Sequence, residues 1–370
     1  MKKFFTPASA SSTTPHRVAA EVTRRITPSL FDAHSRRLAS AVTLSTRTLV
    51  VALFLLLTVG ARAAETGRTF ATPEEAVAAL AATVNHPEAQ SLRDLFGPAT
   101  DELVSTDAVQ GKNDIADFAA AFNAAHHLAM ESPTNYVLEV GTNGWPFPIP
   151  IVQRDGRWFF DTAAGKEELL NRRVGRNELD TLAAVRAYVA AQREYASKDQ
   201  DGDDVLQYAQ KFISSPGKKD GLYWDPGLDG TLSPLGPLMA QAQAEGYGKA
   251  ARTGTGADKN QTAYWTEKDQ PAAADADAGP KPFHGYFFKI LTRQGKNAPA
   301  GKYDYMINGH LLAGFALVAW PANYGESGVM TLIVNQQGRV YQKDLGPKTA
   351  SVVKSMTTYD PDPTWTLSNE

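Results

Sequence analysis

Acidic side chains between residues 199 and 210, in the stretch "DQDGDDVLQYAQ", have the spacing of a helix-flanked calcium loop. Such a loop takes ligands from positions 1, 3 and 5, from the carbonyl at position 7 and from a bidentate Glu at position 12, with Gly at position 6. The residues that would stand at positions 1, 3, 5, 7 and 12 are Asp199, Asp201, Asp203, Val205 and Gln210. Gln210 offers one neutral oxygen where the loop normally has two charged ones, so the sequence predicts a weakened calcium site.

The same stretch also fits an acidic helix cap. Asp204 stands where the calcium loop has glycine, and an aspartate enters the left-handed conformation at a modest cost. Asp204 can instead cap a helix over residues 205–214, with Gln207 at the third helical position as in a capping box. Acids at a helix start also complement its dipole. We expect the acidic cap, with calcium as the alternative and no other cofactor.

Other groups with catalytic potential are few. Asp161 and Glu167 form the carboxylate pair of a hydrolase alternative, which requires both acids to converge in a pocket with a raised pKa. His126 and His127 fall on an expected helix over 113–130, where neighbours point about 100° apart and cannot bind one ion together. The chain has no cysteine, which excludes thiol catalysis. These patterns favour a structural or binding role over an enzymatic one.

The N-terminal residues have the features of an export signal. An apolar run extends from Leu49 to Val59, follows Arg47 and precedes the small residues Ala61-Arg62-Ala63. The run is shorter than the roughly 20 residues of a membrane-spanning helix and suits a signal peptide cleaved near Ala64. We therefore expect residues 1–64 to be a leader with a signal peptide or signal anchor. The protein would then be periplasmic, or anchored facing the periplasm, with membrane contact only through this segment.

Charge is distributed unevenly along the chain. Of 37 basic and 40 acidic side chains, nine basic and two acidic ones lie in residues 1–63, which leaves 28 basic and 38 acidic ones in the remainder. An acidic body repels phosphate backbones, so nucleic acid is not an expected partner.

Residues 65–172 are expected to form a first domain in which helices precede strands. Thr72 and Pro73 mark the start of a helix, and two further helical stretches follow. The spacing of apolar residues then becomes that of strands over 135–141 and 157–162. Asp155-Gly156 fits a tight turn between strands. This order predicts an α+β domain.

Residues 173–370 are expected to form a second α+β domain. A long helix over 177–198 carries an apolar face that includes Leu179, Val185 and Val189. A Gly- and Pro-rich loop follows, then a flexible insertion over 249–282, and then a series of strands from Phe283 onward. Asn308-Gly309 fits a type I′ hairpin turn. The predicted fold class is therefore α+β, with helices packed on small, mostly antiparallel sheets in two domains.

Several long motifs carry a family resemblance. The runs "GWPFPIPIV", "GRWFFDTAAGKEELLNRRVGRNELD", "PFHGYFFKIL", "FALVAWPANYGESGVMTLIVNQQGRVYQKDLG" and "DPDPTW" resemble the bacterial family catalogued as domain of unknown function 2950, over roughly Phe70 to Trp365. The resemblance implies an exported protein without an assigned activity. The first domain is also similar to the nuclear-transport-factor-two-like cone, which often forms a ligand pocket. The second is similar to the heads of type II secretion pseudopilins, and neither analogy establishes a function by itself.

The sequence thus predicts an exported cell-envelope protein with a structural or binding role. Its expected partner is an envelope protein or a small ligand. The alternatives are a carboxylate-dependent hydrolase and a calcium-stabilised binding module.

Overall fold

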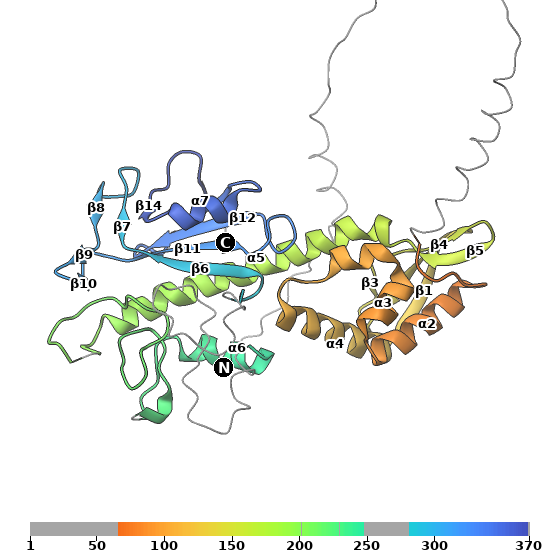
Figure 1. The fold of residues 1–370 in the computed structure, drawn as a ribbon, viewed down its shortest axis with the longest axis horizontal. Coiled ribbons are helices and arrows are strands. Elements are labelled where there is room, and N and C mark those ends of the chain that lie inside the picture. Colours follow the sequence, from red (N-terminus) through yellow and green to blue (C-terminus); the bar gives the residue numbers. More distant parts are fainter. Residues whose placement is uncertain (1–65, 201, 229, 248–280, 369–370) are drawn as a thin grey trace, which may run out of the picture. The chain divides into compact units, whose positions relative to one another are not determined.

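The computed structural model describes residues 66–200, 202–228, 230–247 and 281–368 (Figure 1). These residues form an α+β fold in which helices pack against small, mostly antiparallel sheets, as predicted. The leader over 1–64 and nearly all of the insertion over 249–282 lie outside the described residues. Within the described ranges, no helix has the length and apolar character needed to span a membrane.

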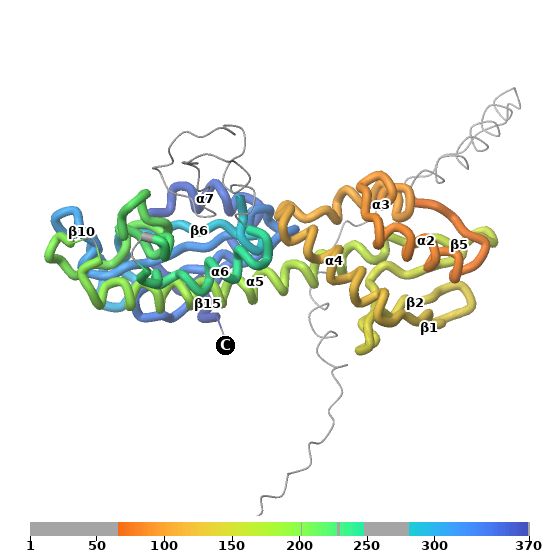
Figure 2. Tube along the Cα trace, turned by 90° about the horizontal axis from the view of Figure 1, so that it is seen from below, coloured from red at the N-terminus to blue at the C-terminus, as the bar shows by residue number. Residues whose placement is uncertain are grey.

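The N-terminal part packs helices against one five-stranded sheet. The helices are α2 (Pro73–Asn85), α3 (Ala89–Phe96), the 3-10 helix η1 (Pro98–Leu103) and α4 (Ala108–Ala124). The strands are β1 (His126–Ser132), β2 (Asn135–Val140), β3 (Trp145–Pro146), β4 (Ile151–Arg154) and β5 (Arg157–Phe160). The order is β1-β2-β4-β5, with β3 paired to β2. Figure 2 shows α2, α3 and α4 together beside β1, β2 and β5.

Aromatic side chains fill the space between these helices and their sheet. The ring of Phe96 lies 5.0 Å from that of Phe160, and Phe118 lies 5.0 Å from Phe147. Such packing buries a large apolar area. The turn at Asp155-Gly156 has φ values of 52° and 77°, the two positive angles of a type I′ hairpin, and is confirmed.

The helix α5 (Thr162–Tyr195) is longer than predicted. It begins at Thr162 because Asp161 caps it, accepting the Ala164 amide at 3.1 Å. The domain boundary expected at residue 172 falls inside this helix. The expected apolar face is also incorrect at Leu179, which is 69% exposed, whereas Val185 and Val189 are buried.

The C-terminal part is built on a second five-stranded sheet, in the order β15-β13-β12-β11-β6. Its strands are β6 (Tyr286–Leu291), β11 (Ala316–Pro321), β12 (Met330–Asn335), β13 (Tyr341–Asp344) and β15 (Thr366–Leu367). Figure 1 shows α5 on one face of this sheet and α7 (Thr349–Ser355) on the other. Tyr286, Phe288 and Phe315 are fully buried in this core.

Short strands complete the C-terminal part. One sheet joins β14 (Thr358–Tyr359), β7 (Arg293–Gln294) and β8 (Tyr303–Asp304), with β14 parallel to β7. A hairpin joins β9 (Met306–Ile307) to β10 (His310–Leu311). Its turn residues Asn308 and Gly309 have φ values of 51° and 86°, which confirms the predicted type I′ turn.

The helix predicted over 205–214 is absent, and this segment is irregular apart from single β-bridges at Tyr208 and Ile213. The Gln192 side chain of α5 donates to the Ala209 carbonyl and accepts from the Ala209 amide, both at 2.8 Å. Tyr208 donates its amide to Leu311 at 2.9 Å. The backbone groups of this segment therefore find partners elsewhere in the fold, which removes the advantage of a local helix. Instead, η2 (Pro226–Leu228) and α6 (Gly236–Glu245) form in the stretch that was expected to be a loop.

Candidate functional site

The acidic loop folds around Asp199. One carboxylate oxygen of Asp199 accepts the Gly202 amide at 2.7 Å, and the other accepts the Asp204 amide at 2.9 Å. Gly202 and Asp204 both have positive φ, at 77° and 62°, so the aspartate does adopt the left-handed conformation expected at the glycine position. The Asp199 carboxylate thus satisfies the backbone of a tight turn.

The rest of the predicted calcium loop is tied to the β9–β10 hairpin. Asp203 accepts the Val205 amide at 3.0 Å and lies 3.4 Å from the His310 ring nitrogen Nδ1. Gln210 donates its side-chain amide to the Gly309 carbonyl at 2.8 Å. The cap interpretation is wrong, because no helix begins at Val205.

The calcium site itself stays a prediction. Asp201, one of the five predicted calcium ligands, lies outside the described residues. Elsewhere in the described ranges, His, Asp and Glu side chains form no group of three or more arranged to hold a metal ion.

The other predicted groups have local partners. Asp161 caps α5, and Glu167 lies exposed further along that helix. His126 and His127 lie on β1 and not on a helix, so their side chains point to opposite faces of the strand. The His126 ring stacks on Phe122 with centroids 4.2 Å apart.

The structure brings together a buried polar cluster that the sequence analysis missed. Asp107, which is 2% exposed, caps α4 by accepting the Val109 and Gln110 amides at 3.1 Å. Its second oxygen accepts the Tyr247 hydroxyl at 2.6 Å and the Gly285 amide at 3.2 Å. Burial and the Asp107 carboxylate raise the pKa of Tyr247. This hydrogen-bond set joins the start of α4 to the residues after α6 and before β6.

His284 lies beside this cluster in a left-handed conformation, with a φ of 47°. Its ring nitrogens lie 3.0 Å from the Glu245 carboxylate and 3.4 Å from that of Asp180. Gln110 also donates to Asn177 of α5 at 2.6 Å. These polar contacts hold α4, α5, α6 and the residues before β6 together, so their role is structural.

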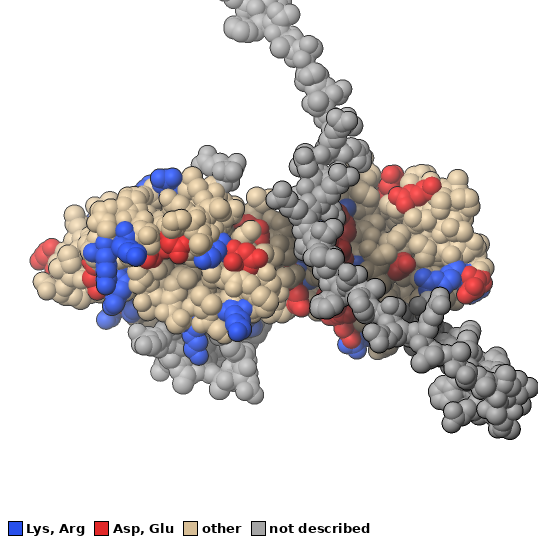
Figure 3. Space-filling view, turned by 90° about the horizontal axis from the view of Figure 1, so that it is seen from above, with Lys and Arg blue, Asp and Glu red and all other residues tan. Residues whose placement is uncertain are grey.

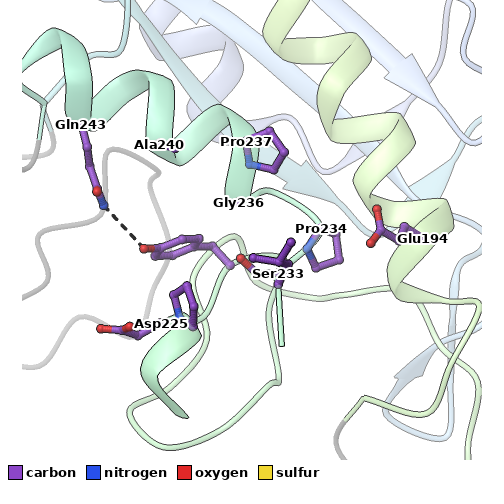
Figure 4. A pocket seen from close by; sticks show the side chains of 11 residues that line it. Glu194, Asp225, Ser233, Pro234, Gly236, Pro237, Ala240 and Gln243 are labelled. Atoms are coloured by element: carbon purple, nitrogen blue, oxygen red, sulfur yellow. Dashed lines mark hydrogen bonds between the residues drawn. The ribbon is translucent and has the colours of Figure 1, made fainter. Parts of the chain in front are cut away.

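A separate pocket of about 630 Å³ opens between the loop that precedes α6, α6 itself and the end of α5 (Figure 4). Its walls are largely apolar. The lining residues are Glu194, Tyr223, Asp225, Pro226, Leu232, Ser233, Pro234, Gly236, Pro237, Ala240 and Gln243.

The polar groups of this pocket have few partners of their own. Ser233 is 3% exposed, and its hydroxyl has no hydrogen-bond partner among the described residues. The side chains of Glu194 and Asp225 are exposed, and no described cation lies within ion-pair distance of either. Figure 4 shows Glu194 reaching toward Pro234 from α5. The Tyr223 hydroxyl accepts only a long, 3.5 Å hydrogen bond from Gln243.

The loop that forms the pocket is fixed by its own contacts. Trp224 donates its indole N–H to the Thr231 carbonyl at 3.1 Å, and Leu235 donates its amide to Leu222 at 2.9 Å. Leu235 and Met239 are buried in the C-terminal core and anchor α6. Proline at the start of a helix is a helix-start signal, so Pro237 could have predicted α6 from the sequence.

The described residues form an α+β fold with two aromatic-rich cores and a solvent-open pocket on the C-terminal part. The family model described as protein of unknown function DUF2950 matches residues 67–367. The chain therefore belongs to this family. No curated protein and no solved structure matches it significantly, so the resemblances to the nuclear-transport-factor-two-like cone and to pseudopilin heads remain predictions.

Proposed function

We propose that this chain is an exported cell-envelope protein with a binding role, and that the pocket beside α6 is its binding surface. The observation that carries the proposal is the buried Ser233 hydroxyl, which lines the pocket without a partner in the described residues. A buried polar group left unpaired costs about 1–3 kcal/mol. A ligand that hydrogen-bonds to Ser233 would recover this cost.

Export rests on the signal-like segment before Ala64. The acidic composition of the rest of the chain makes nucleic acid an unsuitable partner. On the face in Figure 3, basic and acidic side chains of the described residues occur in small groups of both signs. Such a mixed surface suits a protein or small-molecule partner better than nucleic acid. The hydrolase alternative gains no support at Asp161, whose carboxylate serves as the α5 cap.

Cell fractionation with N-terminal sequencing tests the export half of the proposal. We expect the protein in the periplasmic or membrane fraction, with a mature N-terminus near Ala64 or an intact anchor. Recovery in the cytoplasm with an intact leader would contradict it.

Site-specific photocrosslinking tests the binding half. Leu232 lines the pocket and is 79% exposed, so a photoreactive residue placed there should form a discrete adduct in cells. The matched control is Val104, which is 65% exposed at the end of η1 and does not line the pocket. Intact-mass measurement of the purified protein identifies the adduct. Equal labelling at both positions, or none at Leu232, would reject the pocket as the binding surface.

A further inference from the structure

The charged groups at the pocket define which ligands it can hold. Glu194 and Asp225 place two carboxylates at its rim, and no described basic side chain neutralises either one. Asp225 accepts the Gly227 amide at 2.9 Å, which orients it but leaves its charge in place. The rim therefore has an uncompensated negative charge that attracts a cation.

One feature of the pocket favours an anion instead, but its positive charge is smaller than the negative charge of the two carboxylates. The N-terminus of α6 faces the pocket through Gly236 and Pro237, and a helix N-terminus carries a charge of roughly +0.5. Pro237 has no N–H, and Gly236 already donates to the Ser233 carbonyl at 2.8 Å. Met239 likewise donates to the Leu235 carbonyl at 3.0 Å. Two full carboxylate charges outweigh this partly satisfied helix end.

The walls suit an aliphatic stem attached to the cation. Three prolines and Tyr223 give an apolar, largely rigid surface. Lysine and arginine side chains lay their methylene groups on such surfaces while the charged head reaches a polar rim. The ring of Tyr223 can also attract a cation through its face.

The buried Ser233 hydroxyl adds a hydrogen-bonding position at the pocket wall. A hydroxyl donates one hydrogen bond and accepts others, which matches the N–H and C=O of a peptide group. Figure 4 shows Ser233 beside Pro234, and the hydroxyl of Tyr223, another lining residue, accepts from Gln243. A peptide group at Ser233 would place an adjacent side chain along the prolines toward Glu194.

From these contacts we propose that the pocket binds a peptide segment of an envelope partner through a lysine or arginine side chain. This inference rests on the proposed function and names its ligand class. The cation would pair with Glu194, while Asp225 adds negative charge at the other side of the pocket (Figure 4). The stem would pack on Tyr223 and the prolines, and Ser233 would hydrogen-bond to the peptide backbone.

Binding of short peptides to the purified protein tests this inference. The probe is acetyl-Ala-Arg-Ala-amide, and its control contains citrulline, a neutral side chain of nearly the same shape. We expect the citrulline peptide to bind about tenfold more weakly by isothermal titration calorimetry, which corresponds to about 1.4 kcal/mol. Added salt should weaken the arginine peptide selectively, because the rim carboxylates are exposed to solvent.

Two variants on one helix assign the effect to the rim. Glu194→Gln should reduce affinity for the arginine peptide about tenfold and leave the citrulline peptide unchanged. Glu167→Gln removes another exposed α5 carboxylate outside the pocket and should change neither. Ser233→Ala should weaken both peptides equally. Circular dichroism melts of all variants confirm that each is folded.

The outcomes separate this inference from the broader proposal. If both peptides bind equally and Glu194→Gln has no effect, the cation-specific inference is overturned while the binding role stands. If neither peptide binds, the ligand class is wrong, although the photocrosslink at Leu232 still tests the pocket. Loss of that crosslink would overturn both.

Discussion

At the residue scale, several aspartates of this protein organise loops through backbone amides. Asp199 accepts two amides within its own turn. Asp220 accepts the Ser215 amide at 2.7 Å, the Ser215 hydroxyl at 2.9 Å and the Lys211 ammonium at 3.0 Å. Hydrogen bonds to a charged group are about twice as strong as neutral ones, so each of these carboxylates stabilises the loop around it.

The Asp220 contacts predict a defined pH dependence. Burial opposes ionisation of Asp220, but the Ser215 and Lys211 contacts outweigh it and lower its pKa. A lowered folded-state pKa gives stability that is complete above the unfolded value of about 3.9 and is lost as pH falls through the folded value. We expect Asp220→Asn to lower the free energy of unfolding by about 1–3 kcal/mol at pH 7. In urea unfolding curves the difference should shrink toward zero in strong acid, and a difference that persists there would refute the ionic origin.

The calcium prediction can be tested by thermal melts. Asp199 accepts two amides and Gln210 donates its amide to Gly309, so protein contacts hold this loop in place without an ion. We therefore expect equal melting midpoints in calcium and in chelator. A midpoint raised by calcium would show that the loop does bind the ion, because a ligand that binds only the folded state stabilises it. Asp203→Asn should then abolish the rise.

At the element scale, two glycines with opposite roles position the helices. Gly175 lies within α5 and has open space around its Cβ position. Gly285 precedes β6 with a φ of 73°, and a Cβ there would lie 2.6 Å from the Asn177 side-chain nitrogen. The fold does not require a glycine at position 175, whereas Gly285 permits the close approach of α5 to the start of β6.

Alanine at these two positions should therefore have opposite effects. Gly175→Ala should stabilise the fold by about 0.5–1 kcal/mol, because alanine loses less conformational entropy in a helix. Gly285→Ala should destabilise it by about 2–4 kcal/mol through backbone strain and a clash with Asn177. Chemical denaturation measures both. Destabilisation by Gly175→Ala would indicate that this part of α5 contacts something beyond the described residues.

At the scale of the whole molecule, α5 and the Asp107 contacts connect the two hydrophobic cores. The helix contacts η1 as well as β11 and β12, and Asp107 bonds Tyr247 and Gly285 across a sequence separation of more than a hundred residues. Because these links are buried, opening one core would expose unpaired groups at the other.

This coupling predicts a single unfolding transition in differential scanning calorimetry. Asp107→Ala leaves two cap amides, the Tyr247 hydroxyl and the Gly285 amide without their acceptor, and should cost about 2–4 kcal/mol and broaden or split the transition. The control is Asp114→Ala, which removes a partly exposed ion pair with Arg176 and should cost no more than about 1 kcal/mol. Two transitions in the unaltered protein would show that the cores unfold independently.

Local patterns in the sequence were enough to predict the fold class and many individual elements. Thr72-Pro73 marks the start of α2, Asn308-Gly309 gives a type I′ turn, and the pattern from Phe283 onward indicates strands. Each of these depends on the conformational preferences or burial of neighbouring residues alone. The left-handed conformation of Asp204 was also expected from the sequence, whereas the calcium site stays a prediction.

Only the tertiary structure determined the conformation of segments whose backbone groups form hydrogen bonds with residues outside the local sequence. Gln192 and Leu311 bond to the backbone of residues 208–209, which the local pattern "VLQYAQ" could not indicate because neither partner lies within it. The pocket needs Glu194, the Tyr223 loop and α6 together, and its prolines predict only a loop when taken alone. Asp107 meets Tyr247 for the same reason: hydrogen bonds between distant residues depend on packing, which no short stretch of sequence contains.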